Sequence, residues 1–95
     1  MKGESDYLAA AVSIPSTPSP FTELQGQYLA FIYAYTKLNR RSPAEADMQR
    51  YFGTSAPTVH RMVLELERRG LIRRSAGQAR SIELLVAPEH LPVLR

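Results

Sequence analysis

Cysteine is absent from this sequence, and so are long apolar runs. Without a thiol the chain has no disulfide framework, thiolate metal site or thiol nucleophile, which fits a reducing cytoplasm. Apolar stretches such as residues 8–12 are far too short to span a bilayer. The N-terminus carries Glu4 and Asp6 where a signal peptide requires positive charge. We therefore expect a soluble, cytoplasmic protein.

Motifs for catalysis are also lacking. The sequence has no glycine-rich phosphate loop and no paired-histidine metal motif, and its two histidines, His60 and His90, lie thirty residues apart. Glu65 and Glu67 are near each other only as neighbours on a helix surface. We expect no enzymatic activity, no metal, no cofactor and no small-molecule ligand.

Arginine is abundant in the middle of the chain. The 95 residues suit one compact domain, and contents of 44% hydrophobic and 22% charged residues are ordinary for a folded protein. The formal net charge is only +3, yet residues 40–80 hold nine arginines against four acidic residues. Such a basic stretch is either a solvated face or an electrostatic footprint for nucleic-acid phosphates.

Three parts follow one another along the chain. Residues 1–20 are a Pro/Ser-rich N-terminal extension, because positions 13–20 contain three prolines and four hydroxyl residues. We expect this extension to be flexible, although residues 5–12 could instead form a short helix that contacts a partner or the chain itself. Residues 21–87 form the folded domain, and residues 88–95 form a C-terminal tail.

Capping residues predict the first two helices. Thr22 and Gln25 fit a capping box, and the apolar stripe that follows them has helical spacing. We assign this aromatic-rich stripe to the core rather than to a ligand pocket, since an amphipathic helix has to bury such a face. The second helix is expected to begin with Ser42 as its N-cap and Pro43 at its first position.

A short glycine turn joins the second helix to a third. The second helix is expected to stop at Phe52, since Gly53 readily adopts a left-handed C-terminal cap. Thr54 or Ser55 can cap the third helix, which ends at Gly70. Its buried stripe is expected to consist of Val59, Val63 and Leu66. A connection of about three residues makes the two helices cross steeply.

The hydrophobic period changes after Gly70. We expect strands at residues 71–74 and 81–86, joined into a β-hairpin by a polar loop at residues 75–80. Helix, short turn, helix and hairpin follow in the order of a winged helix-turn-helix. The predicted fold class is therefore mostly α with a small β-hairpin, a three-helix core plus a wing.

The start of the third helix suits the major groove of DNA. That groove is about 12 Å wide and admits one α-helix, whose first turns need short side chains and donors that reach base edges. Six residues meet this requirement: Ser55, Ala56, Pro57, Thr58, His60 and Arg61. Arg61 is our first choice for a base contact; its alternatives are a phosphate contact or an ion pair with Glu65.

The other candidates have simpler alternatives. An exposed His60 needs no function, and Ser55 can be the N-cap alone. In the wing, Gln78 and Arg80 are expected to reach phosphate or the minor groove, unless the loop is merely solvated. Arg68 and Arg69 lie beside the C-terminal dipole of their helix, where cations are favoured for stability.

Several runs of the sequence also resemble a known family. The runs are Thr58-Val59-His60, Leu66-Glu67-Arg68-Arg69-Gly70-Leu71-Ile72-Arg73-Arg74, Ala79-Arg80-Ser81-Ile82-Glu83-Leu84-Leu85 and the opening Thr22-Glu23-Leu24-Gln25. Together they make residues 21–86 similar to the N-terminal DNA-binding domain of the LexA repressors. The resemblance implies a recognition helix, a wing and a return strand in these runs.

Two features depart from this family. The turn at residues 53–55 is one residue shorter than usual, and Gln49 is bulkier than the alanine often found at the helix crossing, so no base preference is carried over. LexA repressors also continue into a self-cleaving, dimer-forming domain with a serine–lysine dyad. The only lysines here, Lys2 and Lys37, lie outside any such domain, so we expect no auto-proteolysis.

The sequence thus predicts a transcriptional regulator of the repressor type that binds double-stranded DNA sequence-specifically. The alternative is a winged-helix docking module that binds protein and does not bind DNA. A monomer fits the sequence, and so does a weak homodimer formed through the N-terminal segment or the apolar tail residues Leu91, Val93 and Leu94.

Overall fold

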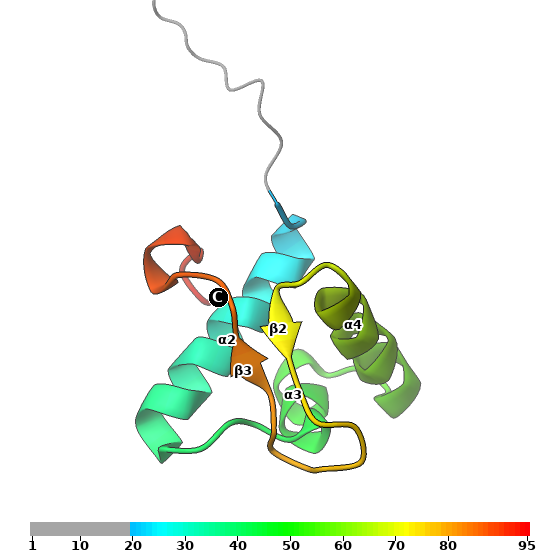
Figure 1. Cartoon of the computed structure of the whole chain (residues 1–95). Coiled ribbons are helices and arrows are strands. Elements are labelled where there is room, and N and C mark those ends of the chain that lie inside the picture. The colour runs from blue at the N-terminus through cyan, green and yellow to red at the C-terminus, as the bar shows by residue number, and fades with distance from the viewer. Residues whose placement is uncertain (1–19) are drawn as a thin grey trace, which may run out of the picture.

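Three helices and a small antiparallel hairpin make up the domain (Figure 1). The computed structural model describes residues 20–95, so the expectations for the N-terminal extension lie, apart from Pro20, outside the described residues. The elements follow in the order α2 (Glu23–Asn39), α3 (Glu45–Phe52), α4 (Ala56–Arg68), β2 (Ile72–Arg73), β3 (Glu83–Leu84) and the short 3₁₀ helix η1 (Pro88–His90). This order confirms the predicted winged helix-turn-helix. Within residues 20–95, no helix has the length and apolarity needed to cross a membrane.

Helix α2 begins at the predicted capping box. The Gln25 amide donates to the Thr22 hydroxyl at 3.1 Å, and the Thr22 amide donates to Gln25 Oε1 at 2.9 Å. Both side chains therefore satisfy amides that the first turn leaves free. The C-cap of this helix is Arg40, which takes a left-handed conformation with φ of 59°.

Helix α3 begins two residues later than predicted. Its N-cap is Ala44, whose amide donates to Asp47 Oδ2 at 2.8 Å, so the side chain of the third helical residue caps the helix. The Ser42 hydroxyl, expected at this position, donates instead to the carbonyl of Arg80 at 2.6 Å. The prediction was wrong because Ser42 is used to hold the wing. The C-terminal cap is Gly53 with φ of 62°, as expected.

Helix α4 follows after the short turn. Ser55 is its N-cap and accepts from the Thr58 amide at 3.3 Å. The predicted buried stripe is confirmed, because Val59, Val63 and Leu66 are fully buried. Its other face is therefore left toward solvent.

The hairpin is shorter than predicted. The ladder pairs Ile72 with Leu84 and Arg73 with Glu83, and one further bond joins the Leu85 amide to the Leu71 carbonyl at 3.0 Å. Toward the loop, Ser81 replaces the ladder with side-chain bonds. Its hydroxyl accepts from the Ser75 amide and lies within hydrogen-bonding distance of the Ser75 and Gln78 carbonyls. The outer residues of the two expected strands (71, 74, 81, 82, 85 and 86) thus lie outside the regular ladder.

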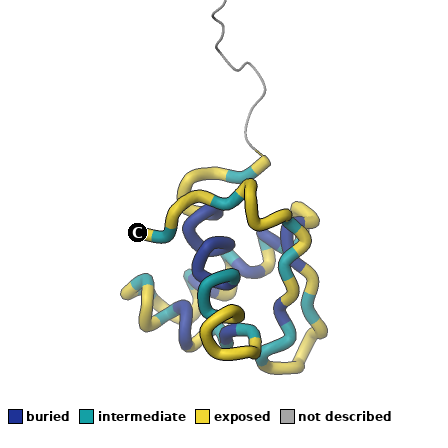
Figure 2. The backbone as a smooth tube through the Cα atoms, turned by 90° about the vertical axis from the view of Figure 1, so that its left-hand side faces the viewer, coloured by how far each residue is buried: buried dark blue, intermediate teal, exposed yellow. Residues whose placement is uncertain are grey.

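The core lies where the helices and the hairpin meet. In Figure 2, most of the segments coloured dark blue for buried residues lie in this region. The aromatic stripe of α2 is part of it. Tyr28 stacks on Phe52 of α3 with ring centroids 4.0 Å apart and planes 9° apart, and Phe31 meets the same ring edge-on. Offset and edge contacts of this kind stabilise a core beyond the area they bury. The interpretation of the stripe as core is confirmed for its middle, whereas its two ends, Leu24 and Leu38, are exposed.

The C-terminal tail packs against α2. The buried amide of Gln27, 4% exposed, donates to the Val93 carbonyl at 2.9 Å and accepts from the Arg95 amide at 2.8 Å. Leu91 and Leu94 pack against the core, whereas Val93 is 86% exposed. The tail is thus part of the domain, and two of its three apolar side chains are already covered within the chain.

We predict that Gln27→Ala lowers the free energy of unfolding by about 1–3 kcal/mol, because two part-buried hydrogen bonds to the tail are lost. Urea unfolding followed by circular dichroism measures the change. Leu38→Ala is the control on the same helix; its side chain is 83% exposed, so its effect should stay within about 0.5 kcal/mol. Equal stability of Gln27→Ala and the unchanged protein would contradict the role given to this amide.

Candidate nucleic-acid interface

One face of α4 is turned outward because the opposite face is buried. Ala56, Pro57, His60 and Arg61 are all exposed, and the larger apolar side chain of Leu64 is half-exposed on the same face. The structure thus brings these four predicted residues together. Leu64 was not predicted, although its place one turn after His60 is a signal that could have indicated it.

The two hydroxyl residues at the start of α4 contact each other. Ser55 Oγ and Thr58 Oγ1 lie 2.8 Å apart, and Ser55 also accepts the Thr58 amide. The capping role given to Ser55 as the simpler alternative is therefore observed. Both side chains stand at the helix end whose partial positive charge favours an anion.

Arg61 makes no ion pair or hydrogen bond through its side chain within the described part of the chain. Its expected alternative partner, Glu65, is held by Arg68 at 2.6 Å and by Arg69 at 2.8 Å. The hydrogen bond from Arg68, followed in size by the one from Arg69, lowers the pKa of Glu65 to about 2. Arg61 is thus an exposed cation on the outward face.

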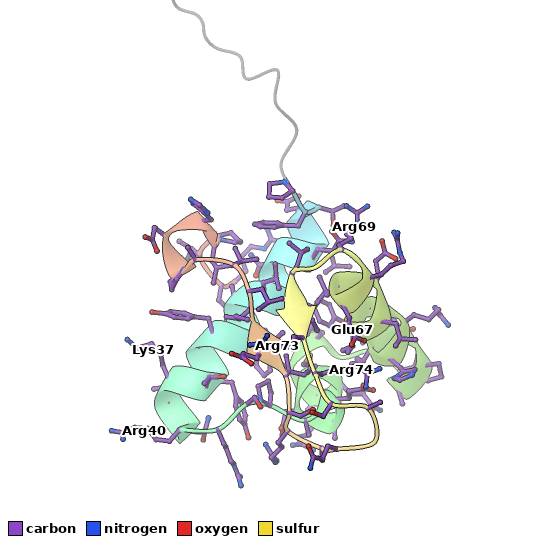
Figure 3. All side chains as sticks on the ribbon, in the orientation of Figure 1. Lys37, Arg40, Glu67, Arg69, Arg73 and Arg74 are labelled. Atoms are coloured by element: carbon purple, nitrogen blue, oxygen red, sulfur yellow. The ribbon has the colours of Figure 1, made fainter. Side chains whose placement is uncertain are left out.

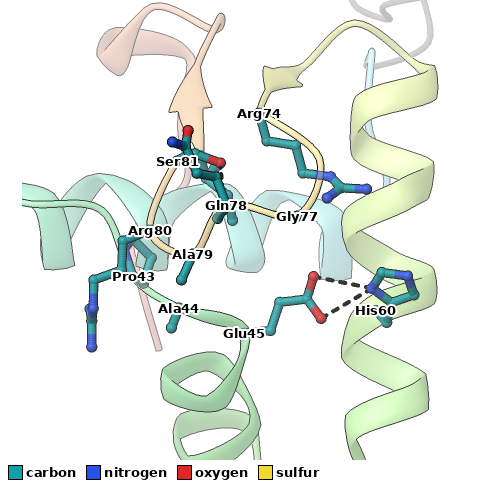
Figure 4. Close-up of a pocket in the computed structure, with 11 residues that line it drawn as sticks. Pro43, Ala44, Glu45, His60, Arg74, Gly77, Gln78, Ala79, Arg80 and Ser81 are labelled. Carbon is teal, nitrogen blue, oxygen red and sulfur yellow. Dashed lines mark hydrogen bonds and ion pairs between the residues drawn. The ribbon is translucent and has the colours of Figure 1, made fainter.

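His60 is paired, unlike Arg61. Its Nδ1 lies 3.1 Å from both carboxylate oxygens of Glu45, the first residue of α3 (Figure 4). The contact joins the two helices on either side of the short turn. Helical spacing on one element does not predict a contact between residues fifteen positions apart, and Glu45 was therefore missed.

A hollow separates the wing from the start of α4. Its volume is about 340 Å³, and its lining includes Glu45, His60, Arg74 and the exposed Gln78 of the wing loop (Figure 4). Arg74 comes from the end of β2 and pairs with Glu67 of α4 at 3.1 Å. The hollow therefore brings one predicted wing residue, Gln78, to the same opening as His60.

Arg80 is directed away from this surface and into the domain. Its Nη1 lies 3.0 Å from the Tyr35 hydroxyl, 3.1 Å from Asp47 Oδ2 and 3.3 Å from the Ser42 carbonyl. Its backbone is left-handed, with φ of 56°. The side chain thus ties the wing to α2, to α3 and to the loop between them, which is a different arrangement from the one expected for a phosphate contact.

Asp47 is the carboxylate among the three partners of Arg80. Burial by itself would raise the pKa of this carboxyl group, which is 8% exposed. The Ala44 amide and the guanidinium groups of Arg80 and Arg50 outweigh burial and hold the pKa below its ordinary value. The folded domain therefore stabilises the ionised form of Asp47.

Internal pairing uses most of the arginines. Seven of the ten pair with a carboxylate, including Arg73 with Glu83 across the hairpin at 2.9 Å. Three arginines pair with no carboxylate among residues 20–95: Arg40, Arg41 and Arg61. Arg40 stands at the end of α2 (Figure 3). Of the three, Arg61 alone is on α4.

The fold and this surface define a winged helix-turn-helix domain with an exposed recognition helix. The family model of the LexA DNA-binding domain matches residues 18–81. The chain belongs to the LexA DNA-binding domain family.

Similar proteins agree with this assignment. The LexA repressor of Thermosipho africanus (strain TCF52B) is 35% identical over 72 residues, which are 76% of this chain and 36% of the relative. The LexA repressor of Verrucomicrobium spinosum is 39% identical over 62 residues, 64% of this chain and 31% of the relative. For the LexA repressor of Thermosipho melanesiensis the figures are 34% over 70 residues, 74% and 35%. The chain spans about a third of the length of these relatives.

We predict that Asp47→Asn removes part of the acid sensitivity of the fold. Because the folded-state pKa of Asp47 is lowered, its ionisation stabilises the protein above the unfolded value of about 4. This stabilisation is lost as the pH falls through the lower, folded value. The variant should be less stable by about 1–3 kcal/mol at pH 7, and the difference should shrink toward pH 2.5.

Urea unfolding at a series of pH values measures both curves. Glu83→Gln is the control, since the pair it breaks is exposed on both sides and contributes about 1 kcal/mol at most. Parallel curves for Asp47→Asn and the unchanged protein would show that Asp47 does not carry this pH dependence.

Proposed function

We propose that the protein binds double-stranded DNA sequence-specifically by placing α4 in the major groove. The observation that carries the proposal is the outward face of α4, which has small side chains at its start and an unpaired arginine one turn further on. A recognition helix needs this arrangement, because short residues allow close approach and arginine reaches base edges. Membership of the LexA DNA-binding domain family supports it.

The wing loop is the second contact in this proposal. Gln78 is exposed, and it lines the hollow beside His60. With α4 in the groove, the loop lies over the adjacent phosphate backbone or minor groove, where an uncharged amide donates hydrogen bonds. Ser55 and Thr58 take the phosphate at the start of α4, and Arg80 holds the wing in place from inside.

The regulatory role proposed is repression of transcription. The relatives are LexA repressors, and a small domain that occupies its site can exclude other proteins from that DNA. A chromosomal target places the protein in the cytoplasm. Leu91 and Leu94 are packed within the chain, so we propose that one copy suffices for one half-site and that any homodimer is weak.

We predict that Arg61→Ala flattens the preference at one base pair of the selected site, with a loss of about 1–3 kcal/mol of discrimination. Selection from a random duplex library at low salt, followed by titration of single-base variants, measures it. Arg40→Ala is the matched control. It removes the same charge from the end of α2, away from α4 (Figure 3), and should leave the selected sequence unchanged.

Two results would count against DNA recognition by α4. The first is that no duplex binds at low ionic strength, where phosphate contacts are strongest; a protein-docking role would then replace the proposal. The second is that Arg61→Ala and Arg40→Ala have the same effect on every sequence, because that outcome assigns Arg61 to general charge only.

We predict opposite effects for two residues of the wing loop. Gln78→Ala should lower DNA affinity by up to about tenfold, the scale of one hydrogen bond to a charged group, with the unfolding free energy unchanged. Arg80→Ala should lower the unfolding free energy, because the buried carboxylate of Asp47 loses one of its partners. Titration of labelled duplex and urea unfolding measure the two quantities; a stable Arg80→Ala protein with weakened binding would reverse the assignment.

A further inference from the structure

The contact between Glu45 and His60 has a consequence for base recognition. Glu45 is the first residue of α3, where the helix dipole favours a negative charge. His60 lies on the outward face of α4, and its side chain remains 52% exposed after the pairing. One edge of the ring is therefore occupied by the carboxylate, and the rest of the ring is accessible.

The pairing determines which ring nitrogen carries the proton. A carboxylate only accepts hydrogen bonds, and both of its oxygens lie 3.1 Å from Nδ1. Nδ1 is therefore the donor, and Nε2 is the nitrogen left for an outside partner. In the neutral ring Nε2 is an acceptor, whereas in the protonated ring it is a donor.

The two arginines that line the hollow together with His60 are already paired. Arg74 and Arg80 line the same hollow from the wing, but Arg74 pairs with Glu67 and Arg80 with Asp47. On α4 itself, Arg61 is the adjacent residue. The positions one turn before and after His60 (56, 57, 63 and 64) are uncharged. Glu45 is thus the carboxylate that contacts this ring and fixes its tautomer.

We propose that Glu45 is a positioning residue for DNA recognition, which holds His60 so that Nε2 reads one base pair in a pH-dependent way. This rests on the proposed function. As an acceptor, Nε2 matches the amino group of adenine or cytosine in the major groove. As a donor, it matches N7 or O6 of guanine, O4 of thymine or N7 of adenine. Adenine therefore suits both states of the ring, and the preference between cytosine and guanine or thymine changes when the ring takes up a proton.

The first test is selection from a random duplex library at about pH 8 and about pH 5.5, followed by titration of single-base variants. For the unchanged protein, the ratio of Kd values between cytosine and guanine or thymine should change roughly tenfold between the two pH values, the scale of one hydrogen bond. His60→Ala should bind with a preference at that position that is weak and the same at both pH values.

Two substitutions at position 45 separate orientation from charge. The amide oxygen of Glu45→Gln still accepts from Nδ1 but is neutral, so the preference at pH 8 should persist. Glu45→Ala should weaken the preference at both pH values. Glu83→Gln removes an exposed carboxylate from the hairpin and should behave as the unchanged protein does.

A second readout needs no DNA. Nitrogen-15 chemical shifts of the His60 ring at pH 8 should show Nδ1 protonated in the unchanged protein and in Glu45→Gln, and a mixture of tautomers in Glu45→Ala. The proposal is overturned if Glu45→Ala keeps both the tautomer and the base preference, because the pair is then only a bridge between helices. It is also overturned if the base preference of the unchanged protein is the same at both pH values. If no duplex binds while the ring shifts follow this pattern, the proposed function fails and Glu45 orients His60 without a role in reading DNA.

Discussion

The buried carboxylate of Asp47 is the group on which the geometry of this domain depends. It caps α3 through the Ala44 amide, and it also binds the guanidinium of Arg80, which in turn contacts Tyr35 of α2. One charged group thereby fixes the start of a helix and the position of the wing. Removing Arg80 is costly, because the buried carboxylate then keeps the Ala44 amide and the largely exposed Arg50 as its main partners. The distance between the wing and α4, and hence the hollow between them, follows from this arrangement.

Ion pairs with carboxylates occupy most arginines of the basic stretch, so few of its arginines are left for an outside partner. Six of the nine arginines between positions 40 and 80 pair with carboxylates, four of them at helical or cross-strand spacing, so their charge contributes to local stability. Arg61 lacks such a partner among the described residues and stands on the outward face of α4. Of the two interpretations of the basic stretch, the solvated face describes most of these arginines, and the phosphate or base contact is proposed for few of them.

Local signals predicted most of the fold, and contacts between distant residues account for what they missed. The Thr22 capping box, the Gly53 turn and the buried stripe of α4 depend on neighbours within four residues, and all three are confirmed. Ser42, in contrast, is a good N-cap by type, but its hydroxyl bonds to Arg80, 38 positions away. The internal contacts of Arg80 and Glu45 were missed for the same reason, since no periodicity relates these residues to Asp47 or His60. The DNA-contacting roles of the residues on α4 and in the wing stay predictions.

The tail brings the two ends of the described domain together. Glu23, at the start of α2, pairs with Arg95 at 3.2 Å. Phe21 and Pro92 pack against Gly26, which has no side chain; a Cβ atom at this position would lie 3.0 Å from Phe21 and 3.1 Å from Pro92. Figure 1 shows the start of α2 at the end of the molecule away from the wing loop and the first turn of α4. The two ends of the described domain therefore lie close together in space. Because its ends meet away from the proposed reading surface, it can be circularly permuted, or inserted as a cassette into a loop of another protein, with that surface left open.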